Sequence, residues 1–147
     1  MYYIGATPVV KRKKSMKTRN EIIFDLSCPY NNIYQGDAKR YLFVCSAGLL
    51  RSATAATVAS QLGFNARSCG SEHYALVPLS VNLLTWAHTI FFVNEENYLS
   101  AQDTFTNQYQ IAMLEEKSVV WDIEDQYDYM NPELVAQITE NLKNVGK

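Results

Sequence analysis

The sequence is poor in the features that mark several classes of protein. Its 147 residues include three Cys, four Pro and six Gly, and no Cys-x-x-Cys pair. Cysteines this few and this widely spaced disfavour both a disulfide framework and a zinc site. No apolar run approaches the roughly 18 residues that a transmembrane helix needs, and the first residues lack the order of a secretory signal. We therefore expect a cytoplasmic protein with reduced thiols, no membrane contact and no metal.

The composition is that of a globular domain. Apolar residues make up 48% of the chain, charged residues 19% and aromatic residues 12%. A chain of this length buries roughly two-thirds of the surface that its unfolded form exposes, so a core can form without disulfides. This balance excludes fibrous, low-complexity and wholly disordered proteins.

The net charge of −2 hides an asymmetry along the chain. Residues 1–40 hold eight Lys or Arg and three Asp or Glu, whereas residues 41–147 hold five and twelve. The run KRKKSMKTR begins with Lys11 and ends with Arg19. Such a run can bind nucleic acid. Because no aromatic residues interleave with it, we favour a solvated segment or an intramolecular partner for the acidic remainder.

The chain divides into an N-terminal extension, residues 1–40, and an α/β domain, residues 41–147. Turn-forming residues crowd CPYNNIYQGD, so the extension is expected to be irregular apart from a short strand at 21–26. From residue 41, strands and helices alternate. Strands are predicted at 41–45, 64–69, 88–94 and 117–123, and helices at 51–63, 78–87, 94–105 and 131–145. This alternation predicts a parallel sheet with helices on both faces and a ligand site beyond the carboxyl ends of the strands.

The segment CSAGLLRS, which begins with Cys45, leaves a predicted buried strand and enters a predicted helix. Backbone N–H groups wrapped around a helix N-terminus can hold an anion. The small residues Ser46, Ala47 and Gly48 allow a close approach of that backbone. The spacing therefore predicts an anion-binding loop over residues 46–51, and the absence of Gly-Lys-Ser/Thr excludes the nucleotide-binding P-loop.

Two side chains of this loop carry chemistry. Arg51 presents a planar fork that can bind two phosphate oxygens. Cys45 lies at the base of the same loop, where the positive field of the amides and the arginine favours its thiolate. A thiolate beneath a bound phosphate is an in-line nucleophile.

The segment LFVCSAGLLRSATAA resembles the phosphate loop of the low-molecular-weight protein tyrosine phosphatases. It is especially similar to a predicted-phosphatase branch of that family in bacteria and phages. The resemblance covers residues 41–145 and includes SCG, WAHTIFFV and WDIEDQYDYMNPELV. It implies a four-stranded parallel sheet and cofactor-free hydrolysis of phosphomonoesters through a phosphocysteine. The implied substrate is a phosphorylated protein, in particular a phosphotyrosine, or a small aryl phosphate.

The resemblance also implies the site residues. Cys45, Arg51 and Asp125 would be catalytic, with Tyr127 flanking the substrate ring. Asp122 is the second choice for the general acid and Asp128 the third. Ser52 would donate a hydrogen bond to the thiolate. The expected phosphate-binding residues are Ser46, Ala47, Gly48, Leu49, Leu50, Arg51 and Ser52.

Two other interpretations use the same segment. A thiol-dependent arsenate reductase would need two further cysteines in series near the loop, and Cys69 is the only candidate for either. A non-catalytic module would hold a phosphorylated partner without turnover. One departure from the family pattern concerns the rigidity of the loop and not its chemistry, because Gly48 stands where the family commonly has an Asn that braces the loop.

Overall fold

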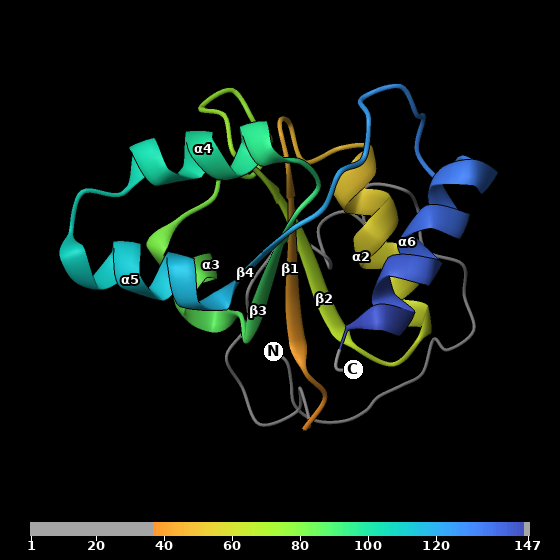
Figure 1. Ribbon diagram of the computed structural model, residues 1–147, viewed down its shortest axis with the longest axis horizontal. Coiled ribbons are helices and arrows are strands. Elements are labelled where there is room, and N and C mark those ends of the chain that lie inside the picture. The colour runs from red at the N-terminus through yellow and green to blue at the C-terminus, as the bar shows by residue number, and fades with distance from the viewer. Residues whose placement is uncertain (1–36, 146–147) are drawn as a thin grey trace, which may run out of the picture.

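The computed structural model describes residues 37–145, which form one four-stranded sheet flanked by helices (Figure 1). The strands are β1 (Arg40–Cys45), β2 (Asn65–Gly70), β3 (Thr89–Phe92) and β4 (Ser118–Val120). The helices are α2 (Arg51–Gln61), α3 (Val81–Trp86), α4 (Glu95–Thr104), α5 (Gln108–Lys117) and α6 (Pro132–Asn144). The strand predicted at 21–26 and the basic run at 11–19 lie outside the described residues.

All strand pairs are parallel, in the order β2-β1-β3-β4. The predicted four-stranded parallel sheet is therefore confirmed. Its central strand β1 is buried on both sides, as expected for a continuous apolar run. Alternate residues of β1 point to opposite faces: Tyr41, Phe43 and Cys45 enter one core cluster, and Leu42 and Val44 enter the other.

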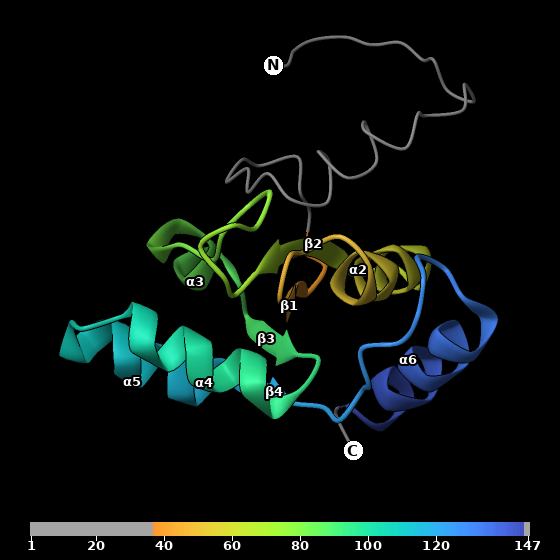
Figure 2. The same cartoon turned by 90° about the horizontal axis from the view of Figure 1, so that it is seen from above.

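The helices cover the two faces separately (Figure 2). Helices α2 and α6 lie on the face of Tyr41, Phe43 and Cys45, whereas α3, α4 and α5 lie on the opposite face. Helix α6 presents Leu134, Ile138 and Leu142, at helical spacing, to the core cluster that it shares with α2. This two-sided cover follows from the crossover connections that parallel strands need.

Besides small shifts at the ends of other elements, the structure differs from the sequence prediction in two places. Helix α5 was not predicted, because Leu114 is its only buried residue and its apolar pattern is weak. Asn107 caps this helix and accepts hydrogen bonds from the N–H groups of Tyr109 and Gln110. Strand β4 ends at Val120, earlier than predicted. The next residues still run beside β3, since the N–H groups of Trp121 and Ile123 donate to Phe92 O and Val93 O.

These connections bring three loops to the carboxyl edge of the sheet. They follow β1, β2 and β4, and the N-terminus of α4 joins them after β3 (Figure 1). Across residues 37–145, we find no helix with the length and apolar character needed to cross a membrane. The carboxyl edge is where open parallel sheets bind ligands, and the candidate site lies there.

Candidate active site

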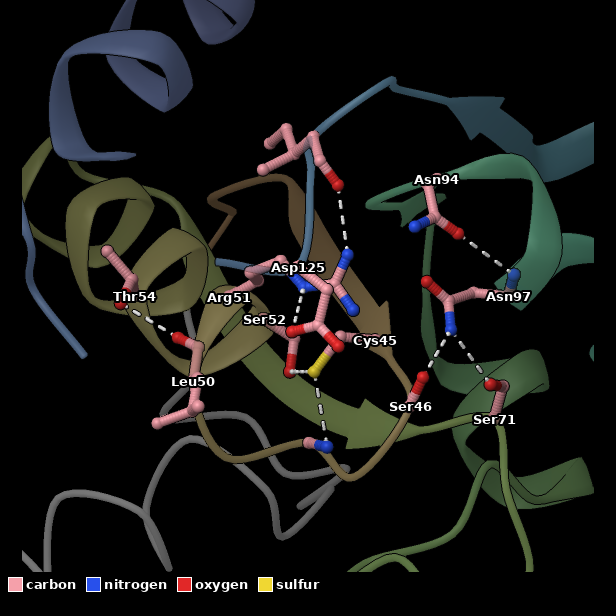
Figure 3. A network of polar contacts seen from close by, with 12 residues as sticks. Cys45, Ser46, Leu50, Arg51, Ser52, Thr54, Ser71, Asn94, Asn97 and Asp125 are labelled. Atoms are coloured by element: carbon pink, nitrogen blue, oxygen red, sulfur yellow. Dashed lines mark hydrogen bonds and ion pairs between the residues drawn. The ribbon is translucent and has the colours of Figure 1, made fainter. Parts of the chain in front are cut away.

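Cys45 ends β1 and is 3% exposed. Its Sγ accepts a hydrogen bond from the N–H of Gly48 at 3.2 Å and lies 3.0 Å from the hydroxyl of Ser52 (Figure 3). A thiolate can only accept hydrogen bonds, so the Ser52 hydroxyl would donate to it in that state. In that state the Gly48 N–H and the Ser52 hydroxyl would both donate to the sulfur.

The loop from Ser46 to Leu50 turns tightly between β1 and α2. Gly48 has φ +79°, a left-handed conformation that glycine adopts without steric cost. A Cβ at this position would lie 2.8 Å from the backbone carbon of Cys69. The absence of a side chain at Gly48 therefore lets the loop lie directly against the end of β2.

Arg51 is the first residue of α2, and its side chain is 4% exposed. Its Nη1 donates to the backbone oxygen of Ile123 at 2.9 Å, and its Nε lies 3.6 Å from Oδ1 of Asp125. The guanidinium therefore joins the loop after β1 to the loop after β4 (Figure 3). The first bond orients the planar group toward the pocket above Cys45.

The loop that carries Asp125 is attached to α2 on both sides of that residue. Upstream, Ile123 O accepts from Arg51. Downstream, the N–H of Met130 donates to Oγ1 of Thr54 at 2.8 Å. These two contacts hold the loop across the start of α2, with Asp125 between them.

A pocket of about 200 Å³ opens above the sulfur. Its lining residues are Cys45, Ser46, Ala47, Leu49, Leu50, Arg51, Tyr74 and Asp125. The structure thus brings most of the predicted site residues together. Gly48 and Ser52 support the loop from behind rather than line the pocket. Among residues 37–145, no three His, Cys, Asp or Glu side chains gather where they could hold a metal ion.

Asp125 is the only acid of its loop in the pocket lining, and its side chain is 72% exposed. Asp122 and Asp128, the second and third choices for the acid, are exposed and do not line the pocket. The contact with Arg51 therefore distinguishes Asp125 from the other two.

Tyr127 does not flank the pocket as the sequence suggested. It is 8% exposed, packs in the core cluster under α6, and its hydroxyl accepts from Nε2 of Gln137 at 2.8 Å. The aromatic ring at the pocket is Tyr74, which is 64% exposed and lies in the loop after β2. Sequence analysis missed Tyr74, because the position of that loop relative to Cys45 depends on strand pairing.

Cys69 is fully buried on the other side of the sheet from Cys45. It is paired in register with Val44 and belongs to the core cluster under α3, whereas Cys45 belongs to the cluster under α2. Burial raises the pKa of the Cys69 thiol well above its usual value, and the neighbouring Cys45 raises it further. The two thiols face different cores, which speaks against a shared redox step.

Asn97 is a second residue that sequence analysis missed. It lies in the first turn of α4, is 2% exposed, and donates hydrogen bonds to the hydroxyls of Ser46 and Ser71 (Figure 3). Its position in the sequence could have identified it. Polar residues that follow a buried parallel strand lie at the same carboxyl edge of the sheet as the Cys45 loop.

Comparisons with known proteins agree with this fold. The low-molecular-weight protein tyrosine phosphatase from Campylobacter jejuni has 17% identity and a TM-score of 0.50, with 71% of this chain and 92% of that chain covered. Wzb from Vibrio vulnificus, in complex with benzylphosphonate, has 14% identity and a TM-score of 0.52, with 70% and 91% covered. No protein-family model matches the sequence, and no curated protein matches it significantly. The chain therefore has the α/β fold of the low-molecular-weight protein tyrosine phosphatases across most of its length.

Proposed function

We propose that this protein is a cysteine phosphatase that hydrolyses phosphomonoesters through a phosphocysteine, without a metal ion. One observation carries the proposal: Sγ of Cys45 lies at the floor of a pocket that Arg51 and Asp125 also line. A nucleophile, a guanidinium fork and a carboxyl group are the three side chains that this reaction needs.

In the first step, a lone pair of the Cys45 thiolate forms the S–P bond while the P–O bond to the leaving group breaks. Arg51 and the amides of residues 46–51 hold the equatorial oxygens, where charge is spread in the transition state. Asp125, which takes up a proton when the phosphate displaces it from Arg51, gives that proton to the leaving oxygen, which departs as a neutral alcohol or phenol. The incoming phosphate would replace the Asp125 carboxylate beside Nε of Arg51, and the exposed Asp125 side chain is free to move aside.

In the second step, the Asp125 carboxylate takes a proton from a water molecule as its oxygen attacks phosphorus. The S–P bond breaks, inorganic phosphate forms, and the electron pair returns to Cys45. Ser52, 3.0 Å from the sulfur, donates its hydroxyl proton as a hydrogen bond to the departing thiolate. The second step thus regenerates the Cys45 thiolate and the protonated Asp125 that takes part in the first step.

The proposed substrate is an aryl phosphate, with protein phosphotyrosine as the biological form. Leu49, Leu50 and the exposed ring of Tyr74 provide apolar surface around the anion site, which suits a flat ring better than a sugar. The names of the two structural neighbours are in keeping with this, since one is a tyrosine phosphatase and the other holds benzylphosphonate.

The test is hydrolysis of para-nitrophenyl phosphate by the full chain in the presence of a chelator. We expect turnover in the wild-type protein, none in Cys45→Ser, and a phosphorylated Cys45 after acid quenching. Cys69→Ala is the matched control, since it removes the other buried thiol of the described residues without touching the pocket. This control is expected to retain activity.

Each alternative predicts a different result. Wild-type protein that binds phosphate tightly but releases no phenol would make the chain a binding module. Thiol-dependent arsenate reduction that disappears in Cys69→Ala would favour the reductase. Full activity in Cys45→Ser would refute the proposed nucleophile.

A further inference from the structure

The side-chain amide of Asn97 connects two loops of the carboxyl edge. Its Nδ2 donates to Oγ of Ser46 at 3.1 Å and to Oγ of Ser71 at 3.2 Å. Ser46 follows β1, Ser71 follows β2, and Asn97 follows β3. One amide group therefore joins the ends of three neighbouring strands (Figure 3).

The side-chain amide of Asn97 uses both of its protons in these two contacts. An amide nitrogen has two protons, and Asn97 gives one to each serine. Both hydroxyls act as acceptors there, and the Ser71 hydroxyl can still donate to Oε2 of Glu72 at 3.1 Å. Neither serine can rotate away without leaving a buried amide proton unpaired, which is unfavourable.

The contact with Ser46 restrains the residue directly after Cys45. The backbone oxygen of Ser46 already accepts from the N–H of Glu72 at 3.2 Å. The Asn97 contact holds the same residue by its side chain. Because Ser46 is held at both points, its own N–H has a fixed direction at the start of the loop that lines the pocket.

Core stability alone does not explain an asparagine at this position. The Oδ1 of Asn97 is buried and has no hydrogen-bond partner within the described residues. An unpaired buried acceptor is destabilising, and it offsets part of what the two hydrogen bonds to Ser46 and Ser71 contribute. Gly48, in the middle of the loop, has no side chain with which to brace it. The remaining advantage of Asn97 is the position that it imposes on Ser46.

We propose that Asn97 is a positioning residue that holds the Cys45 loop in its anion-binding form through the hydroxyl of Ser46. It does not line the pocket, so it would act through Ser46 and not by contact with substrate. This role rests on the proposed function, because it concerns the same loop. Its effect is on phosphate affinity as well as on turnover, so the two proposals can be tested separately.

The test compares Asn97→Leu with wild-type protein in two measurements. The first is binding of inorganic phosphate by calorimetry, and the second is the kcat and KM for para-nitrophenyl phosphate. We expect phosphate affinity and kcat/KM to fall about 10- to 100-fold, the scale of a misplacement of about 1 Å in such a site. A purely structural role would lower the melting temperature and leave both quantities unchanged below it.

Asn94→Ala is the matched control on the same helix. Asn94 caps α4 by accepting from the N–H of Asn97 at 3.3 Å, and within residues 37–145 it forms no hydrogen bond with Ser46 or Ser71. This variant is expected to lower the melting temperature while leaving phosphate affinity unchanged. An equal loss of affinity in both variants would overturn the proposal, because general loosening of α4 would then explain it.

A double-mutant cycle isolates the route through Ser46. If Asn97 acts through that hydroxyl, Ser46→Ala weakens phosphate binding in the wild-type background and adds little in the Asn97→Leu background. Should Asn97→Leu fail to fold, Ser46→Ala alone decides: unchanged phosphate affinity in that variant refutes the proposal.

The wild-type protein separates this proposal from the proposed function. If it binds phosphate without turnover, the phosphatase activity is refuted, and the binding measurements alone test the positioning role. Wild-type protein that binds no phosphate would refute both.

Discussion

The guanidinium of Arg51 lies 3.6 Å, Nε to Oδ1, from the carboxylate of Asp125, and the two side chains differ greatly in exposure, at 4% and 72%. The cation is held in place by Ile123 O, whereas the anion is free to move. An arriving phosphate can therefore take the place of the carboxylate without moving the arginine. This arrangement underlies the first two predictions.

Arg51→Lys is expected to lower kcat for aryl phosphate hydrolysis by about 10²- to 10³-fold, the cost of losing a transition-state donor. A lysine keeps the charge but cannot bind two oxygens at once or donate to Ile123 O in the same geometry. Steady-state kinetics measure the effect. Arg67→Lys is the control, since Arg67 lies on β2 and does not line the pocket; comparable losses in both variants would refute a specific role for Arg51.

Asp125→Asn is expected to slow hydrolysis of phenyl phosphate by about 10²-fold, within the range for loss of a general acid. The loss with para-nitrophenyl phosphate should be smaller, because that leaving group needs less protonation. The measurement is kcat for both substrates.

Glu124→Gln is the control for Asp125→Asn, as it removes a neighbouring exposed carboxylate that does not line the pocket. Asp122→Asn decides between the two candidate acids. A leaving-group-dependent loss in Asp122→Asn, with none in Asp125→Asn, would move the role to Asp122.

Gly48→Ala is expected to destabilise the fold by about 1–3 kcal/mol, the scale of a residue forced into a left-handed conformation, and to abolish phosphate binding. Its Cβ would meet the backbone of Cys69 at 2.8 Å and displace the loop. Urea unfolding and phosphate calorimetry measure the two effects.

The Gly63→Ala variant separates the effect of backbone strain from the effect of displacing the Cys45 loop. Gly63 also has a positive φ, +100°, but a Cβ there would meet nothing within 4 Å. We expect lower stability with unchanged phosphate binding. If Gly48→Ala behaves in the same way, the close approach of the loop to β2 has no functional role.

Folding stability should decrease slightly as the pH falls below about 6.5, the usual pKa of histidine. Partial desolvation of the ring lowers the pKa of His88, and the nearby positive charges of Arg40, Lys39 and Lys117 lower it further. The unfolded chain then binds a proton before the folded chain does, which favours unfolding on acidification. The effect is small because His88 is exposed.

His88→Asn tests this pH dependence. The Nδ1 of His88 accepts from the backbone N–H of Arg40 at 2.9 Å, and the Oδ1 of asparagine can accept in a similar way without titrating. Urea unfolding between pH 5 and about 8 should show a flatter profile in this variant. His73→Asn removes the other histidine as a control, and a profile flattened equally by both would contradict the assignment to His88.

The sequence by itself determined the elements and the local chemistry of the loop. Apolar runs of strand length alternate with helical segments, and this pattern is sufficient for a parallel sheet. Cys45, Gly48 and Arg51 are close in the chain, so their spacing on a strand–loop–helix unit already implies that they meet. Helix α5 escaped prediction because its pattern is nearly uniform in polarity and its single buried residue, Leu114, gives no period.

Only the tertiary structure decided which distant residues join that loop. Tyr74, Asn97 and Asp125 come from three different connections, and strand order rather than sequence distance brings them to one edge. The same pairing turns Cys69 to the other core, and packing against α6 buries Tyr127. The physical reason is that a side chain's face depends on register and packing, and a shift of one residue along a strand reverses it.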